Sequence, residues 1–61
     1  MNQHKTFGSS VANRRDRLNR SITFLAKDVG ISPKYMKQIE TDTIIPSRNV
    51  AERISVILDA P

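Results

Sequence analysis

The sequence contains no cysteine, so neither a disulfide nor a cysteine-ligated zinc ion can stabilise the fold. It also has no apolar run long enough to cross a bilayer and no hydrophobic signal core behind Met1. With 61 residues and only three aromatic side chains, the chain has room for one small core built from mostly local contacts. These absences predict one cytoplasmic domain that contacts no membrane.

The residues that catalysis needs are also missing. His4 lies in a polar N-terminal segment with no second ligand or base nearby, and Ser9 and Ser10 have no His/Asp partners. There is no glycine-rich phosphate loop, and a chain of this size has too little volume for a deep pocket. We therefore expect no enzyme activity, no catalytic residue, no metal site and no cofactor.

Acidic residues are fewer than basic ones, and the excess is uneven along the chain. The net charge is +4, yet residues 1–20 carry five basic residues against Asp16 alone, and residues 41–61 have more acids than bases. This distribution favours a polyanionic partner for the first two thirds of the chain. Arg14, Arg17 and Arg20 could steer such a partner, although a solvated helix face would carry the same residues.

Glycine and proline are sparse, and they divide the chain into segments: Gly8, Gly30, Pro33, Pro46 and Pro61. Apolar residues recur every three to four positions between them, which indicates amphipathic helices. The predicted helices lie near residues 7–18, 22–29, 33–40 and 48–58. The apolar stripe expected to form the core is Phe7, Val11, Leu18, Leu25, Val29, Met36, Ile39, Val50, Ile54 and Leu58. Nothing in the pattern predicts a paired strand, so the fold is expected to be all-α.

Residues around Gly30 predict how two of these helices are joined. Ser21 and Ser32 can cap the helices that follow them, and Pro33 suits the first helical position. Gly30 can adopt the left-handed conformation that ends a helix. Two short helices joined by a tight turn with a glycine form a helix-turn-helix.

Within this motif, Ser21 is followed by Leu25-Ala26, then by residues 29–32 with the sequence Val-Gly-Ile-Ser, and then by Ile39-Glu40. Pro46-Ser47, with Ile54 and Leu58 after them, continues the pattern. From about residue 7 to residue 60 the chain resembles the lambda-repressor-like, Xre-type (Cro/repressor) family of phage and bacterial regulators. The resemblance implies a four-helix domain at residues 7–61, with the fifth helix absent or truncated, behind a flexible arm at residues 1–6.

The resemblance further implies a transcriptional regulator that binds double-stranded DNA sequence-specifically, with residues 33–40 as the recognition helix in the major groove. The residues themselves agree. If Met36, Ile39 and Glu40 face inward, the opposite face of this helix carries two lysines, an amide and a hydroxyl without any acid. Lysine can donate to guanine or phosphate, and glutamine can bind adenine through two hydrogen bonds.

The predicted DNA-binding residues are Ser32, Pro33, Lys34, Tyr35, Lys37, Gln38 and Thr41. Among them, the resemblance assigns base reading to Pro33, Lys34 and Gln38, and backbone contacts to Ser32 and Tyr35. Further phosphate contacts are expected at Ser21, Ile22, Thr23 and Arg14, where the start of a helix favours anions. Arg15 falls where the family places an arginine that pairs with a recognition-helix glutamate, here Glu40, and we expect this ion pair to be structural.

Three departures from the family pattern leave a second interpretation open. Ile22 replaces a frequent phosphate-binding glutamine, Pro33 removes a backbone donor, and Ile44-Ile45 replace basic loop residues. If exposed, these isoleucines, together with the apolar end of the predicted helix at 48–58, would suit a protein partner, so the alternative is an antitoxin-like or anti-repressor protein-interaction module. The chain is expected to be either the N-terminal domain of a longer repressor or a complete miniature protein. In the first case, the resemblance implies a homodimer formed through a C-terminal region missing from this chain. Alone, the chain is expected to be largely monomeric and to bind one half-site weakly.

Overall fold

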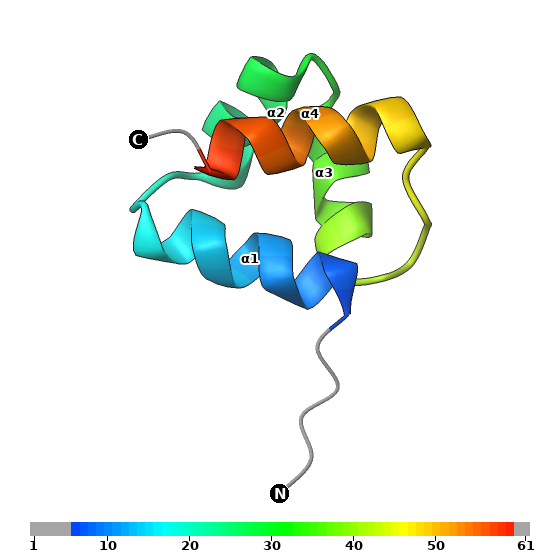
Figure 1. The fold of residues 1–61 in the computed structure, drawn as a ribbon, viewed down its shortest axis with the longest axis horizontal. Coiled ribbons are helices and arrows are strands. Elements are labelled where there is room, and N and C mark those ends of the chain that lie inside the picture. The colour runs from blue at the N-terminus through cyan, green and yellow to red at the C-terminus, as the bar shows by residue number, and fades with distance from the viewer. Residues whose placement is uncertain (1–5, 60–61) are drawn as a thin grey trace, which may run out of the picture.

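Four helices form the fold, and each begins at a hydroxyl side chain that accepts a hydrogen bond from an amide of the first turn. In the computed structural model, which describes residues 6–59, the helices are α1 (Phe7–Arg17), α2 (Ile22–Val29), α3 (Pro33–Glu40) and α4 (Arg48–Asp59) (Figure 1). The capping residues are Thr6, Ser21, Ser32 and Ser47. The predicted all-α fold is confirmed. Two of the predicted helix ends differ by one residue from those observed, at Arg17 and Asp59.

The turn between α2 and α3 has the glycine C-cap and the serine N-cap that its sequence predicts. Gly30 ends α2 with φ +90°, a left-handed conformation that costs glycine little. Its amide donates to the carbonyl of Ala26 at 2.8 Å, and the amide of Ile31 donates to the same carbonyl at 2.9 Å. Ile31 then packs against the core, and Ser32 caps α3 two residues after the glycine. The short turn therefore holds α2 and α3 at a fixed angle.

The core lies between all four helices and consists of eight buried side chains: Val11, Leu25, Ala26, Val29, Met36, Ile39, Ile54 and Leu58. Two members of the predicted stripe, Phe7 and Leu18, are exposed instead. They follow the helical period, but they lie at the first position and the C-cap of α1. The ends of a helix extend past the neighbours that cover its middle, so the correct period does not ensure burial there.

Thr6 belongs to the folded unit, which corrects the predicted arm at that position. Its hydroxyl oxygen accepts from the amide of Ser9 at 3.1 Å and donates to the carboxylate of Asp42 at 2.7 Å. Asp42 follows α3 in a left-handed conformation with φ +61°. The start of α1 is thereby joined to the end of α3. The rest of the predicted arm, residues 1–5, and residues 60–61 lie outside the described residues.

The loop between α3 and α4 treats its two isoleucines differently. The amide of Ile44 donates to the carbonyl of Gln38 at 3.4 Å, and the side chain of Ile44 packs against the core. Ile45 is 94% exposed. The paired apolar surface considered for a protein partner is therefore reduced to one side chain.

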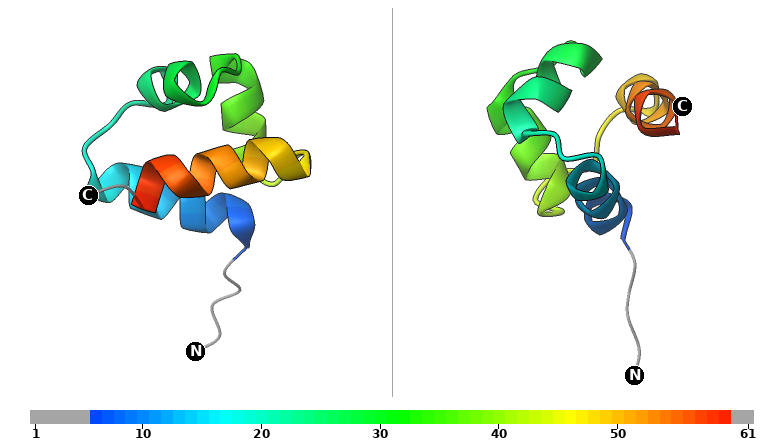
Figure 2. Two further views of the ribbon diagram at one scale, coloured as in Figure 1. Left: turned by 45° about the horizontal axis from the view of Figure 1, so that its top comes forward. Right: turned by 90° about the vertical axis from the view of Figure 1, so that its left-hand side faces the viewer.

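Helix α4 lies alongside α1 and also reaches α2, as the views in Figures 1 and 2 show. An ion pair between Arg14 and Asp59 joins α1 to the last turn of α4. Arg53 donates to the carbonyl of Val29 at 3.5 Å, so it stabilises the end of α2, where the helix dipole is negative. These contacts attach the helix-turn-helix to the rest of the domain. No helix of the part of the chain that the structure describes is long and apolar enough to cross a membrane.

Candidate nucleic-acid interface

Helix α3 has a buried face and a polar face. Met36 and Ile39 are buried, whereas Lys34, Lys37 and Thr41 are exposed. Gln38 is half-buried and lies beside them on the next turn. The spacing of three to four residues brings these polar side chains to one side of the helix. The outer face of α3 thus presents two ammonium groups and an amide, which are donors that fit the major groove.

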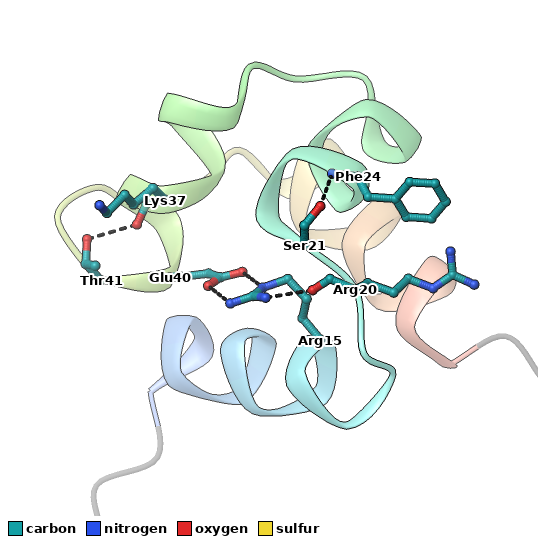
Figure 3. A network of polar contacts seen from close by, with 7 residues as sticks. All are labelled: Arg15, Arg20, Ser21, Phe24, Lys37, Glu40 and Thr41. Atoms are coloured by element: carbon teal, nitrogen blue, oxygen red, sulfur yellow. Dashed lines mark hydrogen bonds and ion pairs between the residues drawn. The ribbon is translucent and has the colours of Figure 1, made fainter.

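Glu40 is the acidic residue of α3, and Arg15 neutralises its charge in an ion pair. The guanidinium of Arg15 donates to both carboxylate oxygens, through Nε at 2.7 Å and Nη2 at 3.1 Å. Its Nη1 donates to the carbonyl of Arg20 at 2.7 Å (Figure 3). The side chains of Arg15 and Glu40 are only 16% and 6% exposed. A single side chain of α1 therefore positions both the end of α3 and the segment that precedes α2.

The hydrogen bond with Glu40 raises the pKa of Arg15, and the loss of hydration on burial opposes it. Arginine is fully protonated at neutral pH even without this shift. The ion pair therefore keeps its cation across the physiological range, and the negative charge of Glu40 is balanced where α3 would approach an anion.

The first turns of α2 and α3 carry no acidic residue. Ser21 accepts from the amide of Phe24 at 3.0 Å, and Ser32 accepts from that of Tyr35 at 3.1 Å, so both serine hydroxyls still have a proton to donate. Within residues 6–59, no acceptor bonds the amides of Ile22, Thr23 and Lys34. A helix start with free donors and no carboxylate favours an external anion such as phosphate.

Comparison with known protein families supports what this geometry indicates. A family model described as Helix-turn-helix matches residues 11–61, which is most of the chain. The chain belongs to the Xre/lambda-repressor-like helix-turn-helix family. This is a family of DNA-binding regulators and not typically of enzymes. No curated protein and no solved structure gives a significant match.

Several residues that were expected to contact DNA already make contacts within the protein. The side chain of Ile22 packs against the core, so only its backbone amide can meet a phosphate. The hydroxyl of Thr41 lies 3.0 Å from the carbonyl of Lys37 and 2.9 Å from the hydroxyl of Thr43. The ring of Tyr35 also packs against the core. Pro33 is exposed at the first position of α3.

Arg14 is not brought to the other predicted contacts. Its guanidinium pairs with Asp59 on the side of α1 that faces α4. Arginines of α1 face different directions because successive residues of a helix are turned by about 100°, and Arg15 faces α3. The helix-turn-helix residues at 21–23 and 32–41 therefore form the candidate interface without Arg14.

Sequence reasoning missed the contact between Arg20 and Phe24. The Cζ atom of Arg20 lies 4.7 Å from the centroid of the Phe24 ring, a cation–π geometry. A signal was present, since Phe24 falls outside the apolar stripe of its helix and an arginine precedes it by four residues. An aromatic side chain in that position has to be exposed, and it is.

Proposed function

We propose that this chain is a sequence-specific, double-stranded-DNA-binding transcriptional regulator of the phage or bacterial repressor type. Its recognition helix is α3, which enters the major groove. The observation that supports this most is the acid-free polar face of α3. Next to it lie the first turns of α2 and α3, which carry free amides and no acidic residue. Membership of a DNA-binding family makes double-stranded DNA the natural ligand of such a face.

In this proposal, the side chains of Lys34, Lys37 and Gln38 meet base edges and phosphates in the groove. The amides of Ile22 and Thr23, together with the hydroxyl of Ser21, bind a phosphate of the DNA backbone. Arg15 contacts no DNA and acts by holding α3 against α1. Two such domains on adjacent half-sites would form the complete complex, as helix-turn-helix proteins commonly do.

A titration followed by NMR tests the proposal. Random-sequence duplex DNA is added at low salt and then at near-physiological salt. Amide shifts confined to residues 21–23 and 32–41 that fade as salt rises are expected, because phosphate binding releases counterions. If those amides stay unchanged, the helix-turn-helix is only a scaffold in this chain and the proposal is wrong.

The side chain of Gln38 is expected to carry sequence preference. Gln38→Ala should weaken binding to a site selected from a random library by about 1–3 kcal/mol, because the adenine contact is lost. Binding to unrelated duplexes should hardly change, as measured by fluorescence anisotropy. Asn49→Ala, which removes an exposed amide from α4, is the matched control. An equal loss on every sequence would contradict base reading by Gln38.

Lys37 is expected to act on the phosphate backbone. Lys37→Ala should weaken binding to all duplexes alike and lower the slope of log K against log salt concentration by about 1. The control is Arg48→Ala, which removes a cation from the exposed start of α4. A salt slope that Lys37→Ala leaves unchanged shows that this ammonium group contacts no phosphate.

A further inference from the structure

Arg20 lies just before α2, and both polar groups of its backbone are bonded to Arg15. The amide of Arg20 donates to the carbonyl of Arg15 at 3.2 Å, and the carbonyl of Arg20 accepts from Nη1 of the Arg15 side chain at 2.7 Å. The guanidinium of Arg15 is in turn fixed by its ion pair with Glu40. The backbone of Arg20 therefore has a fixed place next to Ser21, the N-cap of α2.

The side chain of Arg20 is positioned by Phe24. The Cζ atom of Arg20 lies 4.7 Å from the centroid of the Phe24 ring, whose face attracts a cation. The amide of Phe24 donates to the hydroxyl of Ser21 at 3.0 Å, so the ring belongs to the turn that Ser21 caps. An exposed arginine otherwise samples many rotamers, and an aromatic ring beneath its guanidinium restricts them. The cation of Arg20 is thereby held close to Ser21.

The guanidinium of Arg20 has no anionic partner in the part of the chain that the structure describes. Within residues 6–59 it takes part in no ion pair, whereas Arg14 and Arg15 each pair with a carboxylate. It borders a hollow of about 450 Å³ whose other lining residues include no acid: Leu18, Asn19, Ser21 and Phe24. A guanidinium in a fixed orientation can donate two parallel hydrogen bonds to a phosphate. The surroundings of Arg20 thus suit an external phosphate.

From this arrangement we infer that Arg20, positioned by Phe24, binds a phosphate of the DNA backbone beside the one proposed at residues 21–23. In Figure 3, Ser21 lies between Lys37 on one side and the Arg20 guanidinium with the Phe24 ring on the other. Arg20 thus extends the interface outward, along the strand that borders the groove. Phosphates follow one another along a DNA strand at every nucleotide, so a strand bound at Ser21 also brings a neighbouring phosphate. This role of Arg20 rests on the proposed function, because it adds a residue to the same interface.

The salt dependence of DNA binding tests the phosphate contact. Arg20→Ala should weaken binding to all duplexes alike and lower the slope of log K against log salt concentration by about 1. Between about 50 and 200 mM salt, the original chain should then lose roughly 4-fold more affinity than the variant. Arg48→Ala, which removes an equal charge from the exposed start of α4, is the matched control and should keep the slope. Fluorescence anisotropy measures both, and circular dichroism verifies that each variant is folded.

Phe24 is tested as a positioning residue. Phe24→Leu should weaken binding by about 2–5-fold at every salt concentration, the equivalent of one exposed cation–π contact, and keep the slope because the charge of Arg20 remains. Phe24→Trp, which offers a ring face of the same kind, should bind as the original chain does. In the free protein, the ring should shift the δ protons of Arg20 upfield in the NMR spectrum. That shift should vanish in Phe24→Leu and persist in Phe24→Trp.

An NMR titration with duplex DNA follows Arg20 directly. The backbone amide of Arg20 is bonded to the carbonyl of Arg15, so the side-chain Nε–H is the signal to observe. Duplex DNA at low salt should shift this signal, and added salt should reverse the shift because counterions compete for the phosphate. An Nε–H signal that stays unchanged while the amides at 21–23 shift contradicts the contact.

The outcomes separate this role of Arg20 from the proposed function. If Arg20→Ala keeps the original slope while Lys37→Ala lowers it, the proposed function stands and Arg20 binds no phosphate. An equal drop in slope for Arg48→Ala would reflect net charge alone and would also overturn the inference. Unchanged affinity in Phe24→Leu would show that the ring does not position Arg20. An original chain that binds no duplex at low salt contradicts the proposed function and the role of Arg20 together.

Discussion

Gly8→Ala is expected to destabilise the domain by about 3 kcal/mol, a large part of the total for a chain of this size. Gly8 is buried in the first turn of α1, where that helix crosses the end of α3. A Cβ there would collide with the carbonyl oxygen of Ile39, and would lie 2.9 Å from that of Glu40 and 2.7 Å from Oδ1 of Asp42. Two of these atoms belong to the backbone, so α1 and α3 would have to separate. Alanine normally stabilises a helix relative to glycine, so a loss of stability in Gly8→Ala would identify the steric clash as its cause.

Urea denaturation followed by circular dichroism measures the loss. Gly30→Ala and Gly30→Asn provide the comparison, because a Cβ at Gly30 would meet Nη1 of Arg53 at 3.8 Å, an ordinary contact, and Gly30 has a φ of +90°. There the cost comes from the backbone conformation, so asparagine, which tolerates left-handed φ, should cost less than alanine. At Gly8 the destabilisation comes from a steric clash, so the larger asparagine should destabilise the fold more than alanine does. If asparagine cost less than alanine at both glycines, the close approach of α1 and α3 at Gly8 would not be the cause of the destabilisation there.

Arg15→Ala is expected to cost about 2–3 kcal/mol and to cost more than Glu40→Ala. Removing Arg15 leaves the Glu40 carboxylate, only 6% exposed, without its partner. Removing Glu40 leaves Arg15 still bonded to the carbonyl of Arg20 and more accessible to water. Arg15→Lys should recover little, since an ammonium group cannot donate to both carboxylate oxygens and the carbonyl in this geometry.

A double-mutant cycle with the Arg15→Ala/Glu40→Ala variant checks this order. The double substitution should cost less than the two single losses together, because no unpaired charge remains. The pKa of Arg15 is raised in the folded state, so its stabilisation is complete below the pKa of the unfolded chain and is lost only as pH rises through the folded value. Its guanidinium should thus contribute equally from neutral to moderately alkaline pH. Additive single losses would show that the two side chains stabilise the fold independently.

Local chemistry made much of this fold predictable. The caps at Ser21 and Ser32 and the left-handed Gly30 depend on residues within one turn, and the structure has all three. The contacts of Thr6 and Gly8 with the end of α3 were not predictable, because they depend on which helices cross. Phe7 and Leu18 show the related limit that a period identifies a face of a helix but not how far its neighbours cover that face.

The candidate interface divides in the same way. The outer face of α3 could be predicted from helical spacing once Met36 and Ile39 were placed inside. The pairing of Arg15 with Glu40 links residues 25 positions apart, and only the family resemblance indicated it. The ion pair that engages Arg14 had no such signal, since Asp59 belongs to another helix.

The three hydrogen bonds that Arg15 donates to Glu40 and Arg20 have a consequence for the thermodynamics of the proposed DNA recognition. Because one guanidinium joins the end of α3 to the segment before α2, the two groups of proposed DNA-binding residues are held in a fixed relative position in the free protein. Little of the binding free energy is then spent on ordering the chain. Calorimetry with a DNA duplex should therefore show the modest heat-capacity change of rigid-body association, without the large one that accompanies folding on binding.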